Sequence, residues 1–365
     1  MFVDGFMKAR LGEIFEIGSG GTPSKKNPEY YNGNIPWIKT GDLKEKYLYK
    51  SEDYITELGL NNSSAKMCEP DTVLIAMYGA TIGATSILKI PACTNQACAT
   101  FKKSDKITPE FLYYFFRSQK ERFVKDGVGG AQPNISAGYL KKIEIELLPL
   151  KKQNEITNTL DKLQSIITNL RTQLEKLDLL VKARFVEIFG DTEYNTKKFP
   201  VYKLSELCTV SSSKRIYQDE QSSTGVPFLR ISNLVELIET GHLKNELFIS
   251  DEKYIELVRS NLVPQKGDIL VTSRGTLGKC YIVQDDDKFY FQDGMISWLS
   301  NFSPKVSSIY ISYLFAQPYI QKQIESLQAG STVAYLSIAM LKKINVILPP
   351  KKLQDDFATF VEHVD

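Results

Sequence analysis

The segment KQNEITNTLDKLQSIITNLRTQLEKLDLLVKARFVEI, residues 152–188, decides how this chain is organised. Its apolar residues recur at alternating steps of four and three, which is the heptad pattern of a coiled-coil helix. Neither Gly nor Pro occurs from residue 151 to 189. At 1.5 Å per residue such a helix would be about 55 Å long. A helix packed along one domain is the alternative, which the strict spacing disfavours. The expected seam consists of Ile156, Leu160, Leu163, Ile167, Leu170, Leu174, Leu177 and Val181.

The sequence before this helix is repeated after it, at an offset of about 190–200 residues, the kind of self-similarity that marks a duplicated module. Four blocks recur in the same order, so chance is a poor explanation. IPWIKTGDL (35–43) matches VPFLRISNL (226–234), and VLIAMYGATIG (73–83) matches ILVTSRGTLG (269–278) with one deletion. LKKI recurs at 140–143 and 341–344, and LPLKK (148–152) matches LPPKK (348–352).

Each repeat mixes strand and helix patterns. The apolar runs 73–77 and 269–272 indicate buried strands followed by tight turns, and the alternation at 143–147 indicates a half-buried strand. Thr108 and Pro109 should open a helix over 111–123, with a counterpart at 308–327. We therefore expect an α+β protein in which a long coiled-coil helix separates two pseudo-repeated mixed α/β domains.

The end of the second repeat starts the same helix again. Phe357, Val361 and Val364 continue the seam register after residues 351–352, and the sequence stops about two turns into this helix. We expect a truncated second helix at the C-terminus. The predicted domains are 1–150, a spacer helix at 151–190, a second domain at 191–350, and the start of a distal helix at 351–365.

Composition excludes several classes. The chain has 365 residues, 42% of them hydrophobic and 24% charged, which is ordinary for a globular protein. No apolar run is long enough to span a membrane, and the sequence MFVDGFMKAR lacks the apolar core of a signal peptide. Five scattered cysteines without a CxxC pair fit a reducing cytoplasm. The net charge of +2 does not by itself indicate a nucleic-acid partner.

Catalytic patterns are absent or incomplete. The two histidines, His242 and His363, lie in unrelated contexts, which disfavours a triad or a histidine-rich metal site. Residues 27–30, NPEY, are similar to a methyltransferase tetrapeptide but lack its second proline, and no Gly-rich cofactor loop accompanies them. The stretch SRGTLGKC (273–280) has Ser273 where a phosphate-binding loop needs Gly. We expect no catalytic residue, metal site or cofactor in this chain.

Three pairs of equivalent segments carry residue types suited to DNA. An Arg after a repeated strand could pair with guanine, and a Thr could reach a base or a methyl group; a tight turn with a solvated Arg is the alternative. Small polar residues with cations, at 18–26 and 211–217, suit phosphate contact, the alternative being a solvated loop. The candidate DNA-binding residues are Lys25, Lys26, Tyr30, Lys39, Tyr78, Thr81, Lys214, Arg215, Tyr217, Arg230, Arg274 and Thr276.

Taken in order, these motifs make the chain resemble the specificity subunit of type I restriction-modification systems. The matching stretches are GGTPS (20–24) with IPWI (35–38), GATIG (79–83), the helix start LPLKKQ (148–153), and RFVEIFGD (184–191). The resemblance covers nearly the whole chain. No single motif is decisive, but their order and duplication are specific.

The resemblance implies that each domain is a target-recognition domain reading one half of a bipartite, asymmetric site on double-stranded DNA. It implies that the two helices pack antiparallel, set the gap and dock two modification subunits. Those subunits would bind S-adenosylmethionine and methylate a flipped adenine, while restriction subunits would use ATP and Mg²⁺ for translocation and cleavage. This chain would supply no chemistry of its own.

The short distal helix departs from the family pattern. Without a full partner helix the seam would pair with another copy of the chain or with modification subunits. A coiled-coil interaction protein without DNA binding is the rival hypothesis, and a nuclease or methyltransferase active by itself is a third.

Overall fold

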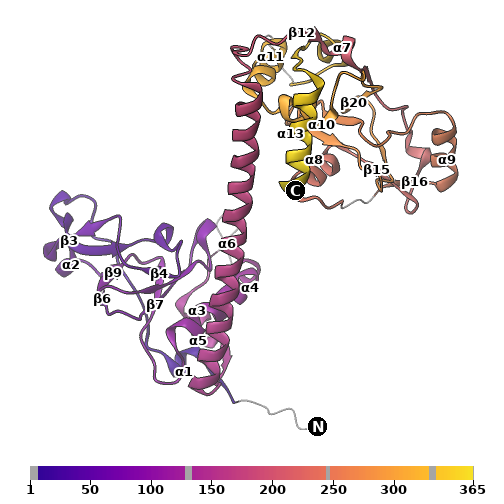
Figure 1. The fold of residues 1–365 in the computed structure, drawn as a ribbon. Coiled ribbons are helices and arrows are strands. Elements are labelled where there is room, and N and C mark those ends of the chain that lie inside the picture. Colours follow the sequence, from indigo (N-terminus) through magenta and orange to yellow (C-terminus); the bar gives the residue numbers. More distant parts are fainter. Residues whose placement is uncertain (1–6, 128–133, 244–246, 329–333, 365) are drawn as a thin grey trace. The chain divides into compact units, whose positions relative to one another are not determined.

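The long helix predicted from the heptads is α6, Leu150–Phe189, which runs unbroken for 40 residues (Figure 1). It belongs to a computed structural model that describes residues 7–127, 134–243, 247–328 and 334–364. The chain divides within α6 into two compact units, Met1–Leu170 (unit 1) and Arg171–Asp365 (unit 2). Both the central helix and the two mixed α/β domains of the predicted fold class are confirmed.

Unit 1 contains short strands and helices that precede α6. Its strands are β1 (Lys8–Arg10), β2 (Ile17–Ser19), β3 (Tyr31–Ile38), β4 (Tyr47–Leu48), β5 (Tyr54–Ile55), β6 (Met67–Cys68), β7 (Val73–Ala76), β8 (Thr85–Leu88), β9 (Ala92–Thr94), β10 (Cys98–Phe101) and β11 (Glu144–Glu146). Its helical segments are α1 (Leu11–Ile14), η1 (Pro28–Tyr30), η2 (Thr40–Asp42), α2 (Glu57–Asn61), η3 (Gly79–Thr81), α3 (Pro109–Ser118), α4 (Lys120–Asp126) and α5 (Ala137–Lys142).

Unit 2 follows α6 with a similar series. Its strands are β12 (Val201–Lys203), β13 (Thr209–Ser211), β14 (Gln221–Ser222), β15 (Val226–Leu229), β16 (Phe248–Ile249), β17 (Ile269–Thr272), β18 (Cys280–Ile282), β19 (Tyr290–Phe291), β20 (Ile296–Ser300) and β21 (Asn345–Ile347). Its helical segments are α7 (Leu204–Leu207), η4 (Gln218–Glu220), α8 (Ile231–Thr240), α9 (Asp251–Arg259), α10 (Ser308–Phe315), α11 (Pro318–Gln328), α12 (Ile338–Leu341) and α13 (Lys351–Val364).

The two units share one strand topology. In unit 1 the order β2-β10-β7-β8 forms one sheet, and β3 pairs in parallel with β9 in a second sheet. In unit 2 the order β13-β20-β17-β18 and the parallel pair β15–β19 are the same arrangement. A small antiparallel pair, β1–β11 or β12–β21, closes each unit. The sequence repeat is therefore a structural repeat.

The units differ in the elements attached to this shared topology. In unit 1 the segment after β3 forms η2 and the edge strand β4, which pairs with β8. In unit 2 the segment after β15 forms the ten-residue helix α8. Leu234 and Leu237 are buried one turn apart on that helix, whereas the unit 1 segment carries Gly41 and three charged residues at 44–46. The matching strands are thus kept while the connections diverge.

The predicted helix over 111–123 is two helices in the structure. Thr108 caps α3, because its Oγ1 accepts from the Phe111 amide at 3.2 Å, as expected for a cap before Pro109. The chain then turns at Gln119, where α3 ends and α4 begins. The turn lets the buried ring of Phe123 reach Phe116, with ring centroids 6.1 Å apart. The counterpart is also divided, into α10 and α11, because Pro318 begins the second helix.

Most of the cysteine thiols are buried inside the two units. Cys68, Cys93, Cys98 and Cys208 are buried and Cys280 is half-buried, and all are free thiols. Burial raises the pKa of Cys93, Cys98 and Cys208 to about 12 in each case, because the thiolate would lose its hydration. These thiols are therefore protonated at neutral pH, which favours structural roles over nucleophilic ones.

A buried glutamine joins the start of each seam helix to its unit. The Gln153 Oε1 atom accepts from the Thr108 amide at 2.8 Å, and its Nε2 donates to the carbonyls of Lys106 and Leu148. Gln354 makes the same set of bonds at the start of α13, with the Ser307 amide donating at 2.8 Å. Since each buried side-chain amide bonds to three backbone groups, each helix start is held in one orientation.

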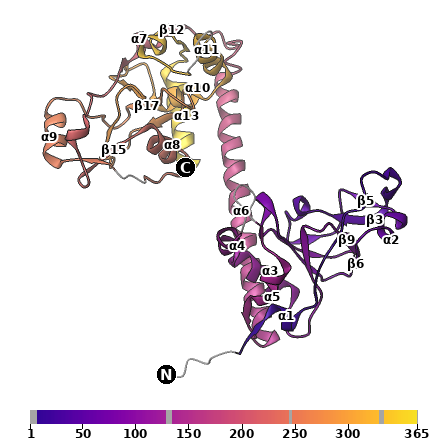
Figure 2. The ribbon, with the colours of Figure 1, turned by 180° about the vertical axis from the view of Figure 1, so that it is seen from behind.

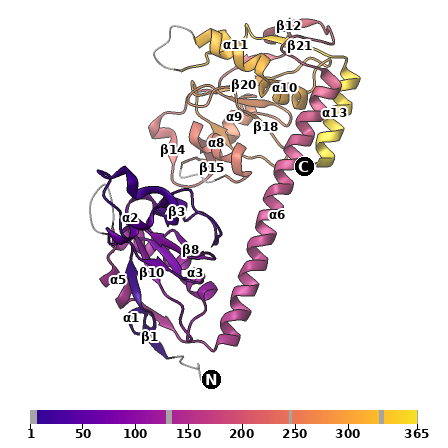
Figure 3. The ribbon, with the colours of Figure 1, turned by 90° about the vertical axis from the view of Figure 1, so that its left-hand side faces the viewer.

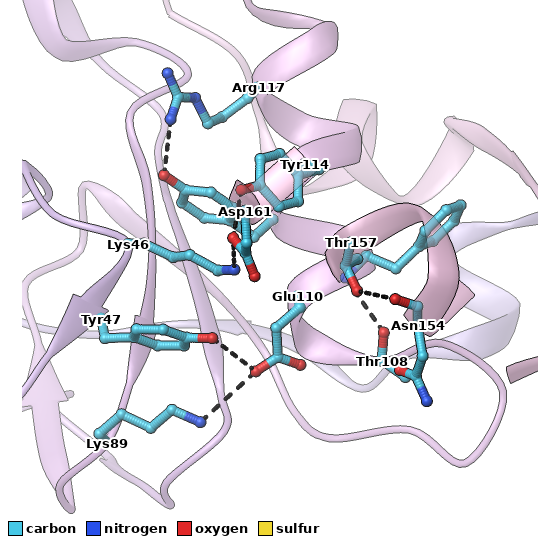
Figure 4. Close-up of polar contacts among 12 residues, drawn as sticks. Lys46, Tyr47, Lys89, Thr108, Glu110, Tyr114, Arg117, Asn154, Thr157 and Asp161 are labelled. Carbon is cyan, nitrogen blue, oxygen red and sulfur yellow. Dashed lines mark hydrogen bonds and ion pairs between the residues drawn. The ribbon is translucent and has the colours of Figure 1, made fainter. Parts of the chain in front are cut away.

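Polar contacts also fix the first half of α6 to unit 1 (Figure 4). Asp161 accepts from Lys46 Nζ and from the Tyr114 hydroxyl, each at 2.5 Å. The Lys46 ammonium lies 4.9 Å from the centre of the Tyr114 ring, a cation–π distance. Beside this cluster, Glu110 of α3 accepts from the Tyr47 hydroxyl at 3.3 Å, and Lys89 Nζ lies 3.8 Å from the same carboxylate. Figure 2 shows α3 beside these first turns of α6.

Aromatic packing fixes the last turns of α6 within unit 2. Phe185 and Phe189 are buried against Tyr310 of α10 and Phe357 of α13, with ring centroids 4.8–5.9 Å apart. The guanidinium of Arg184 lies 5.7 Å from the Phe360 ring. Helix α13 runs antiparallel to these turns (Figure 3), because residues later in α13 meet residues earlier in α6.

Candidate nucleic-acid interface

Three predicted segments of unit 1 meet at the connection between β9 and β10, residues 95–97. The Asn95 amide donates to the Ile38 carbonyl at 3.0 Å, beside Lys39. Thr22 of the basic loop donates its hydroxyl to Gln96. The Met77 amide, beside Tyr78, donates to the Ala97 carbonyl at 2.8 Å. One short connection thus gathers the basic loop, the end of β3 and the loop after β7.

The same gathering occurs in unit 2, at the β19–β20 connection. The Gln292 amide donates to the Leu229 carbonyl at 2.9 Å, beside Arg230. Asp293 accepts from Arg215 Nε at 2.9 Å, and the Gly294 amide donates to Ser212 Oγ at 3.2 Å. The Ser273 amide donates to the Met295 carbonyl at 2.9 Å, which places the Arg274 loop there as well. We call residues 95–97 and 292–295 the junctions of the two units.

The basic loop of unit 1 is anchored, although its composition suggested a flexible loop. The Trp37 Nε1 group donates to the Gly21 carbonyl at 3.0 Å, and the Tyr31 hydroxyl donates to the Pro23 carbonyl at 2.5 Å. Lys25 and Lys26 extend beyond these anchors and are exposed. Tyr30 is half-buried, and its backbone carbonyl accepts from the Thr56 amide at 3.0 Å, so the backbone at the end of the loop is held in place.

Three of the predicted cations are paired with carboxylates. Lys39 pairs with Asp53, and this hydrogen bond raises the pKa of the lysine. Lys214 Nζ lies 3.5 Å from Glu256, and Arg215 pairs with Asp293. All of these ion pairs are at least partly exposed, and such pairs contribute only about 0–1 kcal/mol, so a phosphate could replace the carboxylate.

Four predicted cations carry no such partner. Lys25, Lys26, Arg230 and Arg274 are exposed, and within the described ranges none of them forms an ion pair. Tyr217 is also exposed, beside the paired cations of its loop. These cations are available for phosphate or base contacts in both units.

The loops after β7 and β17 have matching backbones and different side chains. Gly79 and Gly275 have φ values of 69° and 70°, in the left-handed region where other residues are strained. Thr81 Oγ1 donates to the Tyr78 carbonyl at 3.3 Å, so this hydroxyl is used within the turn. Thr276 is exposed, and its carbonyl accepts from Thr272 Oγ1 at 2.5 Å.

Each of these loops is bridged to a residue that we did not identify from the sequence. Tyr78 forms an isolated antiparallel β-bridge with Asn134, and Arg274 forms one with Tyr335. Both partners stand two residues before the serine that caps the next helix, Ser136 or Ser337. The matching Ile135-Ser136 and Leu336-Ser337 pairs, upstream of the repeated LKKI block, are the sequence signal that could have located them.

The described residues do not contain a cluster of three or more His, Cys, Asp or Glu side chains placed to hold a metal ion. Over the same ranges, no helix has both the length and the apolar character needed to cross a membrane.

Fold and site together define a modular recognition protein, in which two copies of one domain present different side chains on a common backbone. The model of the type I restriction modification DNA specificity domain matches residues 4–178 and again residues 196–365. The chain therefore belongs to that family and contains its domain twice, which confirms the resemblance drawn from the motifs.

Individual relatives match this chain along nearly its whole length. The MjaIX specificity subunit of Methanocaldococcus jannaschii is 27% identical over 97% of this chain and 85% of its own length. A putative type I specificity subunit of Haemophilus influenzae is 26% identical over 96% of this chain and 86% of its own. The solved S subunit of a type I system from M. genitalium has the same fold, with a TM-score of 0.61 and 17% identity, covering 100% of this chain and 91% of that one. No finding favours the scaffold without DNA binding.

Proposed function

We propose that this chain is the DNA-reading subunit of a type I restriction-modification complex, each of its domains reading one half of a bipartite, asymmetric site. The observation that carries the proposal is the pair of junctions. In both units one connection gathers the basic loop, the cation after β3 or β15, and the loop after β7 or β17. A shared backbone with unlike side chains suits two domains that bind the same polymer and read different sequences.

The roles of the side chains follow from their charge and exposure. Lys25, Lys26 and Arg230 would contact phosphates, which position the protein without selecting sequence. Arg274 has the donor geometry for guanine O6 and N7 in the major groove. We propose that the chain acts in the cytoplasm and binds no cofactor, leaving S-adenosylmethionine, ATP and Mg²⁺ to its partner subunits.

The exposed middle of α6 supports a docking role for the seam. Leu170 and Leu174 are 53% and 63% exposed, and the seam side chains Leu163, Ile167 and Leu177 are exposed too. Leucines at seam positions gain stability only when a partner covers them. We propose that this stretch docks the modification subunits and sets the gap between the half-sites, and self-association through it is the rival outcome.

Among the described residues, nothing in unit 1 covers the surface that corresponds to the one covered by the end of α6 in unit 2. Phe111 and Phe115 are half-buried and line a cavity of about 270 Å³. Their counterparts in unit 2, Tyr310 and Leu314, are fully buried, with Phe185 lying against Tyr310. By this equivalence, unit 1 retains room for a helix end that carries aromatic side chains.

DNA affinity should fall steeply with salt, because each phosphate contact releases condensed counterions. The three proposed phosphate contacts would give a slope of about −2.7 in log K against log salt, or a loss of roughly 40-fold between 50 and 200 mM. The Lys25→Ala/Lys26→Ala variant should reduce the slope by about two. Fluorescence anisotropy of a labelled duplex, titrated at several salt concentrations, measures both.

The matched control is Lys120→Ala/Lys125→Ala, two exposed lysines of α4 outside the junctions. It should keep the full slope. Salt-independent binding, or no measurable DNA affinity, would contradict the proposed function. Either result would support the rival hypothesis of a coiled-coil interaction protein without DNA binding.

A further inference from the structure

The two isolated bridges place one further side chain beside each proposed base-contacting loop. In unit 1 the bridge joins Tyr78 to Asn134, and the next residue is fixed because the Ile135 amide donates to the Met77 carbonyl at 2.9 Å. In unit 2 Arg274 is joined to Tyr335, and the Leu336 amide donates to the Ser273 carbonyl at 2.9 Å. Each loop is therefore one side of a short, two-stranded arrangement.

Burial shows which way the bridged residues face. In unit 1, Met77 and Ile135 are buried. Tyr78, which follows Met77, and Asn134, which precedes Ile135, are exposed. Unit 2 has the same alternation, with Ser273 and Leu336 buried and the bridged pair exposed. Directly opposed residues of an antiparallel bridge have Cβ atoms about 4.5–5.5 Å apart on one face. The exposed side chains are therefore neighbours.

The chemistry of the two pairs differs in a way that suits two targets. Each pair combines a tyrosine with one planar hydrogen-bonding group, the amide of Asn134 in unit 1 and the guanidinium of Arg274 in unit 2. An asparagine amide matches N6 and N7 of adenine, and an arginine matches O6 and N7 of guanine. In unit 1 the tyrosine, Tyr78, belongs to the loop after β7. In unit 2 the tyrosine, Tyr335, belongs to the segment that is bridged to the loop after β17.

Both planar groups are free to bind a ligand. Among the residues that the structure describes, none hydrogen-bonds to the Asn134 amide. The Arg274 guanidinium makes one hydrogen bond in the same ranges, donating to Met295 Sδ at 3.8 Å. Apart from each glycine and its two chain neighbours, no described atom lies within 4 Å of where a Cβ would stand at Gly79 or Gly275, so the space beside each pair is open.

In unit 2, the backbone of the bridged residue Tyr335 is held in place by Gln328. Gln328 donates from Nε2 to the Tyr335 carbonyl at 2.7 Å and accepts from the Tyr335 amide at 2.8 Å. Held residues lose less freedom on binding, which favours specific contacts.

We propose that Asn134 reads an adenine in one half-site and that Arg274 reads a guanine in the other, with Tyr78 and Tyr335 as the neighbours that position them. This inference rests on the proposed function and adds Asn134 and Tyr335 to the specificity-determining residues. Each reader belongs to one unit and therefore governs one half-site alone.

Selection from a randomised DNA duplex by the purified full chain, followed by sequencing, tests the assignment. Asn134→Ala should lose about 5- to 150-fold of the preference for one base in one half-site and leave the other half-site unchanged. Arg274→Ala should lose the preference at one position of the other half-site only. Tyr335→Ala should weaken the preference at the same position as Arg274→Ala. Arg274→Lys should keep most of the affinity and weaken the base preference, because lysine lacks the planar fork.

Exposed residues of the same types supply the controls, Asn158→Ala on α6 and Arg259→Ala at the end of α9, and both should select the wild-type motif. The fluorescence of Trp37 and Trp298 reports whether each variant is folded. The assignment is overturned if folded variants lose affinity evenly across all sequences, or keep every base preference. If the wild-type chain itself selects no motif, the proposed function fails together with the assignment.

Discussion

Phe185→Ala is expected to lower the free energy of unfolding of unit 2 by about 3–5 kcal/mol, the usual cost of truncating a buried phenylalanine. The ring is fully buried and contacts Phe189, Tyr310 and Phe357, so it joins the end of α6 to both α10 and α13. Removing it leaves a cavity among three aromatic rings that cannot easily close. Since whole domains are stable by about 5–15 kcal/mol, this is a large fraction of the total.

The chain has two tryptophans, one in each unit, so urea unfolding can be followed separately in the two. Trp298 is buried in β20 and donates to Asp268 at 2.8 Å, while Trp37 lies in β3. In a Trp37→Phe background, the free energy of unfolding measured from Trp298 fluorescence should fall by about 3–5 kcal/mol. Val186→Ala, at an exposed position one residue further along α6, should change it by less than about 0.5 kcal/mol. An unshifted Trp298 transition in Phe185→Ala would contradict the role of this aromatic cluster.

The double variant Leu170→Glu/Leu174→Glu is expected to abolish docking on the seam and leave the fold intact. Both side chains are more than half exposed, so charges there disturb no internal packing. A buried leucine contributes about 1.5–3 kcal/mol, so two of them should cost at least about 100-fold in affinity for a partner helix. Co-purification with the cognate modification subunit, and light scattering of the chain alone, measure the loss.

Ser165→Glu/Thr172→Glu provides the matched control, because these exposed residues lie on the opposite face of the heptad and receive the same added charge. It should behave as the wild type in both measurements. If light scattering alone changes, the seam serves self-association and not the modification subunits. If the leucine variant co-purifies and associates as the wild type does, no partner docks on the seam.

Much of the architecture was predictable because two kinds of pattern act locally. The heptads of α6 need no knowledge of the rest of the chain, and the strands β7 and β17 appear where the repeated apolar runs stand. The division of 111–123 at Gln119 was not predicted, because neither Gly nor Pro marks the turn that brings Phe123 against Phe116. Helix α8 was not predicted either, since the repeat suggested the same structure after both strands.

The candidate site was predictable by segment but not by contact. The repeated positions of the basic loop and the Arg274 loop pointed to one surface, and the junctions that gather them follow from strand order. That Lys39 pairs with Asp53, or that Arg215 pairs with Asp293, depends on residues brought together by folding. The partnership of Tyr78 with Asn134 is of the same kind, because a bridge between segments far apart in the chain leaves no local pattern.

The most direct test of the two-domain DNA-reading function is a methylome. This chain would be co-expressed with its cognate modification subunit, their complex verified by co-purification, and the methylated adenines of the host mapped by single-molecule sequencing. We predict one new motif in two parts separated by a gap of fixed length, and Asn134→Ala and Arg274→Ala should each degenerate a different part. A verified complex that produces no new methylated motif, or a motif in one undivided part, would contradict the conclusion that the two domains read two half-sites.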